Sequence, residues 1–260
     1  MTKREGPSRR GWLKAASAGA AGLFAAGCEK LTASPQVNAT LDRAEGLNHL
    51  VHRLIGGRTA LAREYPESAI SREFRANGST SPDSEAYLQL VAENFAGYRL
   101  EIGGLVERPL SLSLDEVRAA PARTQITRHD CVEGWSAIAK WTGARLGPLL
   151  DRAGLKPEAR YLAFFCADTL ELTLDGTGDY YETIAVEDAY HPQTILAYEM
   201  NGQTLPVAHG APLRLRLERQ LGYKMAKYVM RIEAIEGFDH LGLGKGGYWE
   251  DRGYQWYAGI

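Results

Sequence analysis

Short stretches of alternating apolar and polar residues, mixed irregularly with short helical patterns, constrain this fold more than any other feature of the sequence. Residues 98–102, 170–174 and 213–217 alternate with a period of two, which is typical of strands with one buried face. The apolar runs at 161–167 and 229–235 are typical of buried strands. Since the strands do not alternate regularly with long helices, we predict an α+β fold with a mixed or antiparallel sheet.

Helical patterns are short and few. One covers residues 40–55 and ends at a Gly-Gly pair, and a second covers 113–117, where Ser113 can cap the first turn. A third helix is predicted over 141–153. The aromatic, glycine-rich tail at 246–260 is expected to pack against the rest of the domain.

Composition narrows the possible classes of function. The 260 residues are 45% hydrophobic and 24% charged, as in ordinary globular proteins. Thirty basic residues against 32 acidic ones give a formal net charge of −2, so the basic surface of a nucleic-acid-binding protein is not expected. Three cysteines without a CxxC or CxxCH motif exclude a disulfide scaffold, a paired-cysteine zinc site and covalently attached haem.

The first 27 residues have the pattern of an export signal. Residues 1–14 carry a charge of +4, and residues 15–27 are uncharged and weakly apolar. The segment SRRGWLK at 8–14 resembles the twin-arginine motif, which predicts export to the periplasm. Cys28 follows Ala-Ala-Gly and could carry a lipid anchor; cleavage nearby and a retained signal are the alternatives.

The densest chemical signal is the segment RHDCVEGWS at residues 128–136. Arg128 and His129 are expected to lower the pKa of Cys131 and to favour its thiolate. A thiolate can act as a catalytic nucleophile or as a soft metal ligand, and the residues alone leave both open beside a buried, inert cysteine. Two later segments, HGAPLR at 209–214 and GYKMAK at 222–227, offer cations and backbone N–H groups suited to a phosphate.

Together these segments resemble the sulfite oxidase superfamily. CVEGWS at 131–136 and WTG at 141–143 are similar to its molybdenum-ligand segment, and most similar to the periplasmic, haem-free branch that contains methionine sulfoxide reductase catalytic subunits. The likeness continues through HPQT at 191–194 and through both phosphate-suited segments. It implies a sulfite-oxidase-type molybdopterin-binding fold without the C-terminal immunoglobulin-like domain, and a monomer.

The chain is predicted to have three parts. The residue patterns indicate a twin-arginine signal at residues 1–27 and a tether with an N-terminal helix at 28–73, and the resemblance implies a molybdopterin-binding oxidoreductase domain at 74–260.

The resemblance also implies a cofactor and its ligands. One molybdenum would be held by the dithiolene of one molybdopterin and by the Cys131 thiolate, since soft sulfur donors suit a redox-active metal. Arg128 and His129 would lie beside the metal and bind a small oxo-type substrate, and Asp130 and Glu133 would be structural. Seven residues are assigned to the pterin and its terminal phosphate: Asn77, Cys166, His209, Arg214, Met225, Ala226 and Lys227.

The implied function is two-electron oxygen-atom transfer, as sulfoxide-type reduction or sulfite-type oxidation, in the periplasm. Electrons would pass to or from a separate membrane or periplasmic cytochrome, and no nucleic acid partner is expected. Two alternatives remain at this point. One is a metal-free thiol enzyme with Cys131 as nucleophile, and the other is a non-catalytic cofactor-binding protein or chaperone.

Overall fold

The computed structural model describes residues 34, 46–47, 50–51 and 59–260. Contacts within the chain divide it into two units, Met1–Ile55 and Gly56–Ile260. Of the predicted helix at 40–55, the four described residues are helical. Its other residues, the signal segment and Cys28 lie outside the described part, and no helix of the described part is long and apolar enough to cross a membrane.

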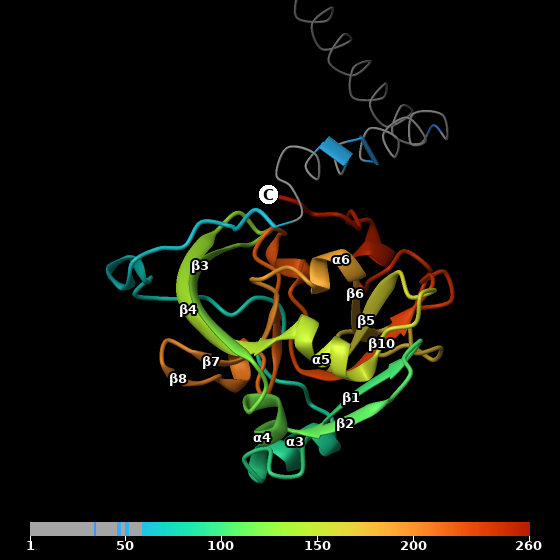
Figure 1. Cartoon of the computed structure of the whole chain (residues 1–260), viewed down its shortest axis with the longest axis horizontal. Coiled ribbons are helices and arrows are strands. Elements are labelled where there is room, and N and C mark those ends of the chain that lie inside the picture. Colours follow the sequence, from blue (N-terminus) through green and yellow to red (C-terminus); the bar gives the residue numbers. More distant parts are fainter. Residues whose placement is uncertain (1–33, 35–45, 48–49, 52–58) are drawn as a thin grey trace, which may run out of the picture. The chain divides into compact units, whose positions relative to one another are not determined.

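Two five-stranded sheets form the second unit (Figure 1). The first has the order β2 (Leu110–Ser113), β1 (Arg99–Gly104), β10 (Val229–Ile235), β5 (Tyr161–Thr169) and β6 (Asp179–Ala185). The second has the order β3 (Ala122–Asp130), β4 (Ser136–Arg145), β7 (Ile195–Met200) and β8 (Gln203–Thr204), with β9 (Arg214–Arg216) also paired to β7. Only β1 and β10 pair in parallel among these strands, so the predicted mixed sheet is confirmed.

Helices are short, as expected from the sequence. They are α3 (Glu85–Ala92), α4 (Leu114–Arg118), α5 (Leu146–Ala153) and α6 (Val186–Ala189), with 3-10 turns η1 (Glu67–Ala69), η2 (Val207–His209), η3 (Gly222–Lys224) and η4 (Glu250–Arg252). The predicted cap of α4 is confirmed: Ser113 Oγ accepts the Glu116 N–H at 3.2 Å, and Glu116 accepts the Ser113 N–H at 2.8 Å.

One apolar core joins the two sheets and α5, which lies between them in Figure 1. Leu100 and Ile102 on β1 are buried in it while Arg99 and Glu101 are exposed, which is the predicted period of two. Leu196 of β7 and Leu149 of α5 belong to the same core. The functional site can therefore draw residues from both sheets.

Two predictions of secondary structure are wrong. The predicted helix at 141–153 begins only at Leu146, because β4 continues to Arg145 and pairs with β3 and β7 on its two sides. Gly143 permits this pairing, since a Cβ there would collide with the Leu196 backbone. The pattern at 170–174 is a turn between β5 and β6, in which Leu172 and Leu174 are fully exposed.

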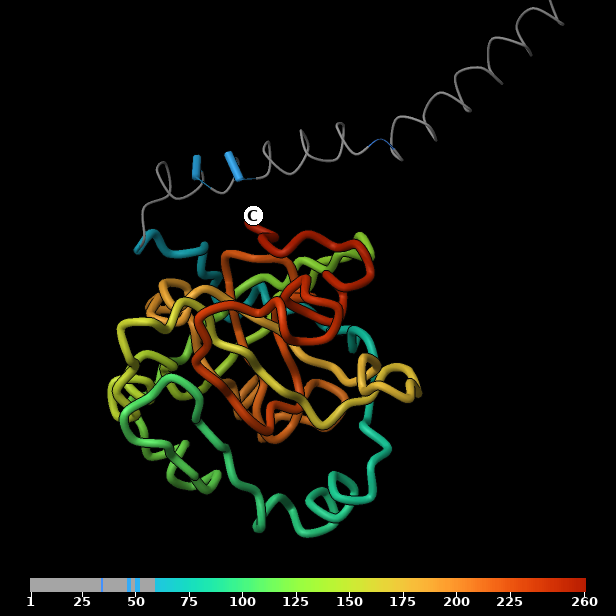
Figure 2. Tube along the Cα trace, turned by 90° about the vertical axis from the view of Figure 1, so that its right-hand side faces the viewer, coloured from blue at the N-terminus to red at the C-terminus, as the bar shows by residue number. Residues whose placement is uncertain are grey.

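The two ends of the second unit pack along it. The segment at 59–73 follows the edge of β3, where Tyr65 N–H donates to the Ile126 carbonyl at 2.9 Å. The C-terminal segment, red in Figure 2, pairs through Gly247 with Glu182 of β6. The compact tail is therefore confirmed. The functional division between residues 73 and 74 stays a prediction.

Candidate functional site

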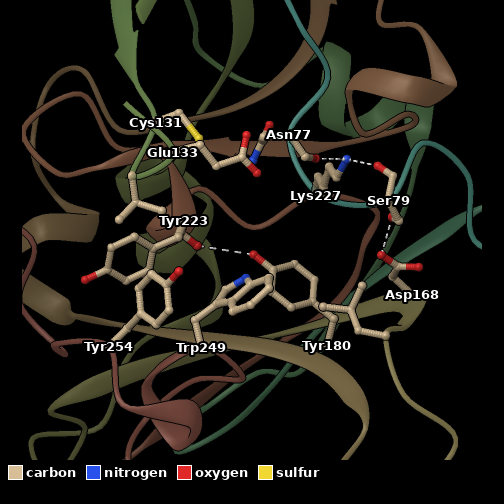
Figure 3. A pocket seen from close by; sticks show the side chains of 13 residues that line it. Asn77, Ser79, Cys131, Glu133, Asp168, Tyr180, Tyr223, Lys227, Trp249 and Tyr254 are labelled. Carbon is tan, nitrogen blue, oxygen red and sulfur yellow. Dashed lines mark hydrogen bonds between the residues drawn. The ribbon is translucent and has the colours of Figure 1, made fainter. Parts of the chain in front are cut away.

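A pocket opens beside Cys131 (Figure 3). Asn77, Cys131 and Lys227, three residues assigned from the sequence, line this pocket. The remaining walls contain acidic and aromatic side chains that the sequence analysis had not assigned to a site.

Cys131 occupies the first position of the loop that joins β3 to β4. Its N–H donates to the Trp135 carbonyl at 2.9 Å, and its own carbonyl accepts the Gly134 N–H at 3.0 Å. Gly134 has φ of 86°, a left-handed conformation that glycine adopts without strain. Asp130 accepts the Ser136 hydroxyl across the hairpin at 2.5 Å. The loop is thus held by backbone and strand-end contacts, and the thiol is left to face the pocket.

The expected lowering of the Cys131 pKa is wrong. Burial raises the pKa of this thiol, and the nearby Glu133 charge adds to the effect. The cations that oppose the shift are Arg214 and Arg75, whereas Arg128 is paired with Asp130 at 2.9 Å. An unmodified Cys131 therefore lacks the activated thiolate that a nucleophilic enzyme needs.

Neither Arg128 nor His129 lines the pocket. As neighbours on β3, the two side chains point to opposite faces of the sheet. Arg128 lies on the exposed face of β3. His129 is fully buried, and its Nδ1 lies 3.1 Å from the Arg216 guanidinium. Burial, Arg214 and Arg216 hold the pKa of His129 well below its usual range, so this ring is neutral at pH 7.

Two buried cations lie at the pocket: Lys227 lines it, and Arg214 contacts the lining residue Asn77. Arg214, fully buried on β9, donates to Asn77 Oδ1 at 3.0 Å and to the His209 carbonyl at 3.3 Å. Lys227 donates to the Asn77 carbonyl at 2.6 Å and to the Ser79 carbonyl. The fully buried salt bridges of the described part involve Arg216 and Lys224 instead.

The pKa values of this cation pair show the cost of its burial. Desolvation and the charge of Arg216 lower the pKa of Arg214 to about 9. Desolvation and the charge of Arg214 lower the pKa of Lys227 to about 7. Arg214 Nε and His209 Nδ1 are buried without a hydrogen-bond partner. A phosphate would supply the missing negative charge and acceptors, so these residues fit the terminal phosphate of a pterin cofactor.

The other residues assigned to the cofactor surround this cation pair. Met225 and Ala226 are buried between η3 and Lys227, and the Met225 N–H donates to the Gly222 carbonyl at 3.1 Å. Cys166 lies opposite Val229 in the β5–β10 pair, near the backbone of Lys227. Its side chain lines a second pocket, and burial raises its pKa well above the ordinary range. Hydrogen bonds thus link Asn77, His209, Arg214 and Lys227. Met225 and Ala226 belong to the apolar core, and Cys166 lines a neighbouring pocket. The assignment of all seven residues to the cofactor stays a prediction.

Phe74 connects these groups and was missed in the sequence. Its ring lies 5.5 Å from the rings of His129, Trp141 and His209. Trp141 in turn lies beneath the Arg216 guanidinium at 4.4 Å. Phe74 is the first residue of the predicted domain at 74–260. Its neighbours in the sequence gave no sign that its ring would pack between His129 and His209.

The remaining pocket residues are acidic and aromatic. Asp168 is buried on β5 and accepts a hydrogen bond from the Ser79 hydroxyl, and burial raises its pKa. Glu133 lies in the Cys131 loop and accepts the Trp135 indole N–H at 2.9 Å. Opposite the Cys131 loop lie four aromatic side chains (Figure 3): Tyr180, Tyr223, Trp249 and Tyr254. The aromatic tail is a visible sequence signal, but only the fold shows that it reaches this pocket.

Comparison with known proteins gives consistent matches. The family described as "Oxidoreductase molybdopterin binding domain" matches residues 88–239. A protein-methionine-sulfoxide reductase subunit named YedZ1, from Azospira oryzae, is 36% identical over 253 residues, which cover 97% of this chain and 88% of that protein.

Shorter matches include the protein-methionine-sulfoxide reductase catalytic subunit MsrP. The Xanthomonas axonopodis pv. citri protein is 37% identical over 54% of this chain and 45% of its own length, and the Campylobacter jejuni protein is 32% identical over 55% and 51%. The match thus spans about half the length of these MsrP relatives. Among solved structures, the sulfane dehydrogenase SoxCD from Paracoccus pantotrophus has a TM-score of 0.48 and 26% identity, over 54% of this chain and 39% of that chain.

Proposed function

Because the chain belongs to the oxidoreductase molybdopterin-binding domain family, we propose that it is a protein-methionine-sulfoxide reductase like the relatives named for that activity. The observation that carries the proposal is the placement of Cys131 on the wall of a pocket backed by two buried cations. A single thiol and a phosphate-binding centre are what one molybdenum with one pterin dithiolene requires of a protein.

The chain's residues would divide the work of holding that cofactor. Cys131 would ligate the metal, Arg214 and Lys227 would bind the terminal phosphate, and Asn77 and His209 would hydrogen-bond the pterin. When bound, the cofactor would supply the two-electron redox chemistry for oxygen-atom transfer. A sulfoxide then takes up two electrons and two protons and leaves as a sulfide, with water as the second product.

The site geometry weakens the thiol-enzyme alternative. Burial raises the pKa of Cys131, and the adjacent His129 is directed into the interior with Arg216. A nucleophilic cysteine needs the opposite, a lowered pKa and a base within reach.

Location and electron supply form the second half of the proposal. The SRRGWLK segment supports export to the periplasm by the twin-arginine route. The name of the Azospira relative, a reductase subunit, supports association with a partner protein. We assign that role to a membrane or periplasmic cytochrome that delivers electrons to a monomer of this chain.

The test is metal analysis combined with sulfoxide reduction. Protein from a molybdenum-replete host should contain stoichiometric molybdenum and reduce methionine sulfoxide with reduced viologen. Cys131→Ala should lose both the metal and the activity. Cys166→Ser is the matched control and should retain molybdenum, because Cys166 lines a neighbouring pocket and not that of Cys131. Full methionine sulfoxide reduction by molybdenum-free protein would refute the proposal.

A further inference from the structure

Four aromatic side chains line the pocket across from Cys131. We call this surface the aromatic wall: Tyr180, Tyr223, Trp249 and Tyr254 (Figure 3). The Tyr254 ring lies 5.1 Å from the Tyr223 ring and 5.5 Å from the Trp249 ring, each measured between centroids. Two of these residues come from the C-terminal segment, so that segment completes the pocket.

The polar ends of the buried tyrosines are already used by the protein. The Tyr180 hydroxyl donates to the Tyr223 carbonyl at 3.3 Å, and the Tyr223 hydroxyl donates to the Gln255 carbonyl at 2.6 Å. Since these hydroxyls are engaged by main-chain carbonyls, the rings are what remains to contact a ligand. Such a surface favours apolar groups and polarisable sulfur.

A buried ion cluster holds the aromatic wall in place. Lys224, next to Tyr223, lies 2.5 Å from Glu182 on β6 and 2.5 Å from Glu250, next to Trp249. All three charged side chains are at most 1% exposed. The wall is therefore built before a ligand arrives, and little conformational entropy is lost when one binds.

The charged side chains of the pocket favour a neutral substrate over an anionic one. Glu133 and Asp168 both line it, and the lining cation Lys227 is directed to the carbonyls of Asn77 and Ser79. Since Lys227 is assigned to the phosphate of the cofactor, the side chains left to contact a substrate are two carboxylates and the aromatic surface, which would repel an oxyanion such as sulfite. A neutral sulfoxide avoids the repulsion and places its carbon substituents on the rings.

We propose that the aromatic wall is the specificity surface of this enzyme and binds the apolar substituent of a neutral sulfoxide through Trp249 and Tyr254. Selectivity should therefore rise with the apolar area beside the sulfur. This inference rests on the proposed reductase function and adds the residues that choose its substrate.

The experiment compares molybdenum-loaded wild type with Trp249→Ala and Tyr254→Ala. The readout is the ratio of kcat/KM for methyl p-tolyl sulfoxide to kcat/KM for dimethyl sulfoxide. Loss of one ring should lower this ratio about tenfold, mainly through the KM of the aryl substrate. Trp249→Phe, which keeps a ring, should retain most of the ratio and covers the case in which Trp249→Ala does not fold.

Tyr190→Ala is the matched control. Tyr190 is 42% exposed, close to the 36% of Tyr254, and its hydroxyl donates to Asp151 away from the pocket. This variant should leave the ratio unchanged. Calorimetric binding of methyl p-tolyl sulfide to molybdenum-free protein gives a second readout, and Tyr254→Ala should weaken that binding about tenfold.

The outcomes separate the two proposals. If wild type reduces both sulfoxides but the ratio is the same in Trp249→Ala and Tyr254→Ala, the aromatic wall is not the specificity surface. Preferred turnover of sulfite over both sulfoxides would overturn the charge argument. If wild type reduces no sulfoxide, the reductase proposal fails, and sulfide binding to the molybdenum-free protein still decides whether the wall holds such groups.

Discussion

Replacing Lys224 with methionine should destabilise the protein strongly, because it removes the cation between two buried carboxylates. Lys224 Nζ lies 2.5 Å from an oxygen of Glu182 and 2.5 Å from one of Glu250. At an effective dielectric constant of about 20, each contact supplies roughly 7 kcal/mol of attraction before desolvation is subtracted. Removing one partner of a buried ion pair typically costs about 3–5 kcal/mol, and we expect a loss in that range at neutral pH.

The loss should depend on pH in a defined direction. Burial and the Glu250 charge already raise the pKa of Glu182 well above its ordinary value, and Lys224 is the group that lowers it. Without Lys224, the folded protein must bind one more proton than wild type does. Such a group stabilises the folded state at low pH and loses that effect as pH rises. Between pH 5.5 and 7.5 the cost of Lys224→Met should grow by about 2–3 kcal/mol.

Urea unfolding followed by circular dichroism at these two pH values measures both effects. Lys140→Met is the matched control, since Lys140 is also 2.5 Å from a carboxylate, that of Glu67, but the two side chains are 31% and 71% exposed. That variant should unfold nearly as wild type does at either pH. Equal losses in the two variants, or a Lys224→Met loss that does not change with pH, would refute the reasoning.

Three further predictions address the site and the fold. Cys131→Ser should abolish molybdenum incorporation, measured by mass spectrometry, while the circular dichroism spectrum stays that of wild type, because the loop depends on backbone hydrogen bonds; retained metal would contradict this. Sulfate, whose charge is constant in this range, should bind molybdenum-free protein more weakly as pH rises through about 7, since Lys227 has a pKa of about 7 and loses its proton there, and a flat calorimetric profile from pH 6 to 8 would exclude Lys227 from the anion site. Ser113→Ala should lower the free energy of unfolding by about 1 kcal/mol through loss of the α4 capping box, with an unchanged urea midpoint as the contrary result.

The sequence predicted the parts of the fold that have strong local patterns. β10 matches the predicted strand at 229–235 residue for residue, and α4 begins at its predicted cap. β4 and β7 were missed because their structure depends on pairing with strands distant in the chain. Five of the six β7 residues are buried, so this strand has no alternation to reveal it.

Site residues that lie in short sequence motifs could be predicted. Site residues whose position depends on how distant segments pack together could not. Asn77, Cys131 and Lys227 came from short segments and meet at one pocket. Arg128 and His129 could have been separated in advance, since adjacent residues of a strand cannot face the same side. No local pattern could show that the tail lies opposite the Cys131 loop.

The position of β10 has a consequence for the order of folding. The first sheet contains two antiparallel pairs of strands, β1 with β2 and β5 with β6. Both pairs precede β10 in the sequence, and β10 lies between them in the sheet. The first sheet therefore closes only when the chain beyond residue 229 joins residues 99–104 and 161–169, a pairing of high contact order that slows folding. Because β10 directly follows the phosphate-suited segment at 222–227, a bound cofactor would stabilise the closed sheet. Protein that retains the cofactor would therefore be protein in which β10 has paired with β1 and β5.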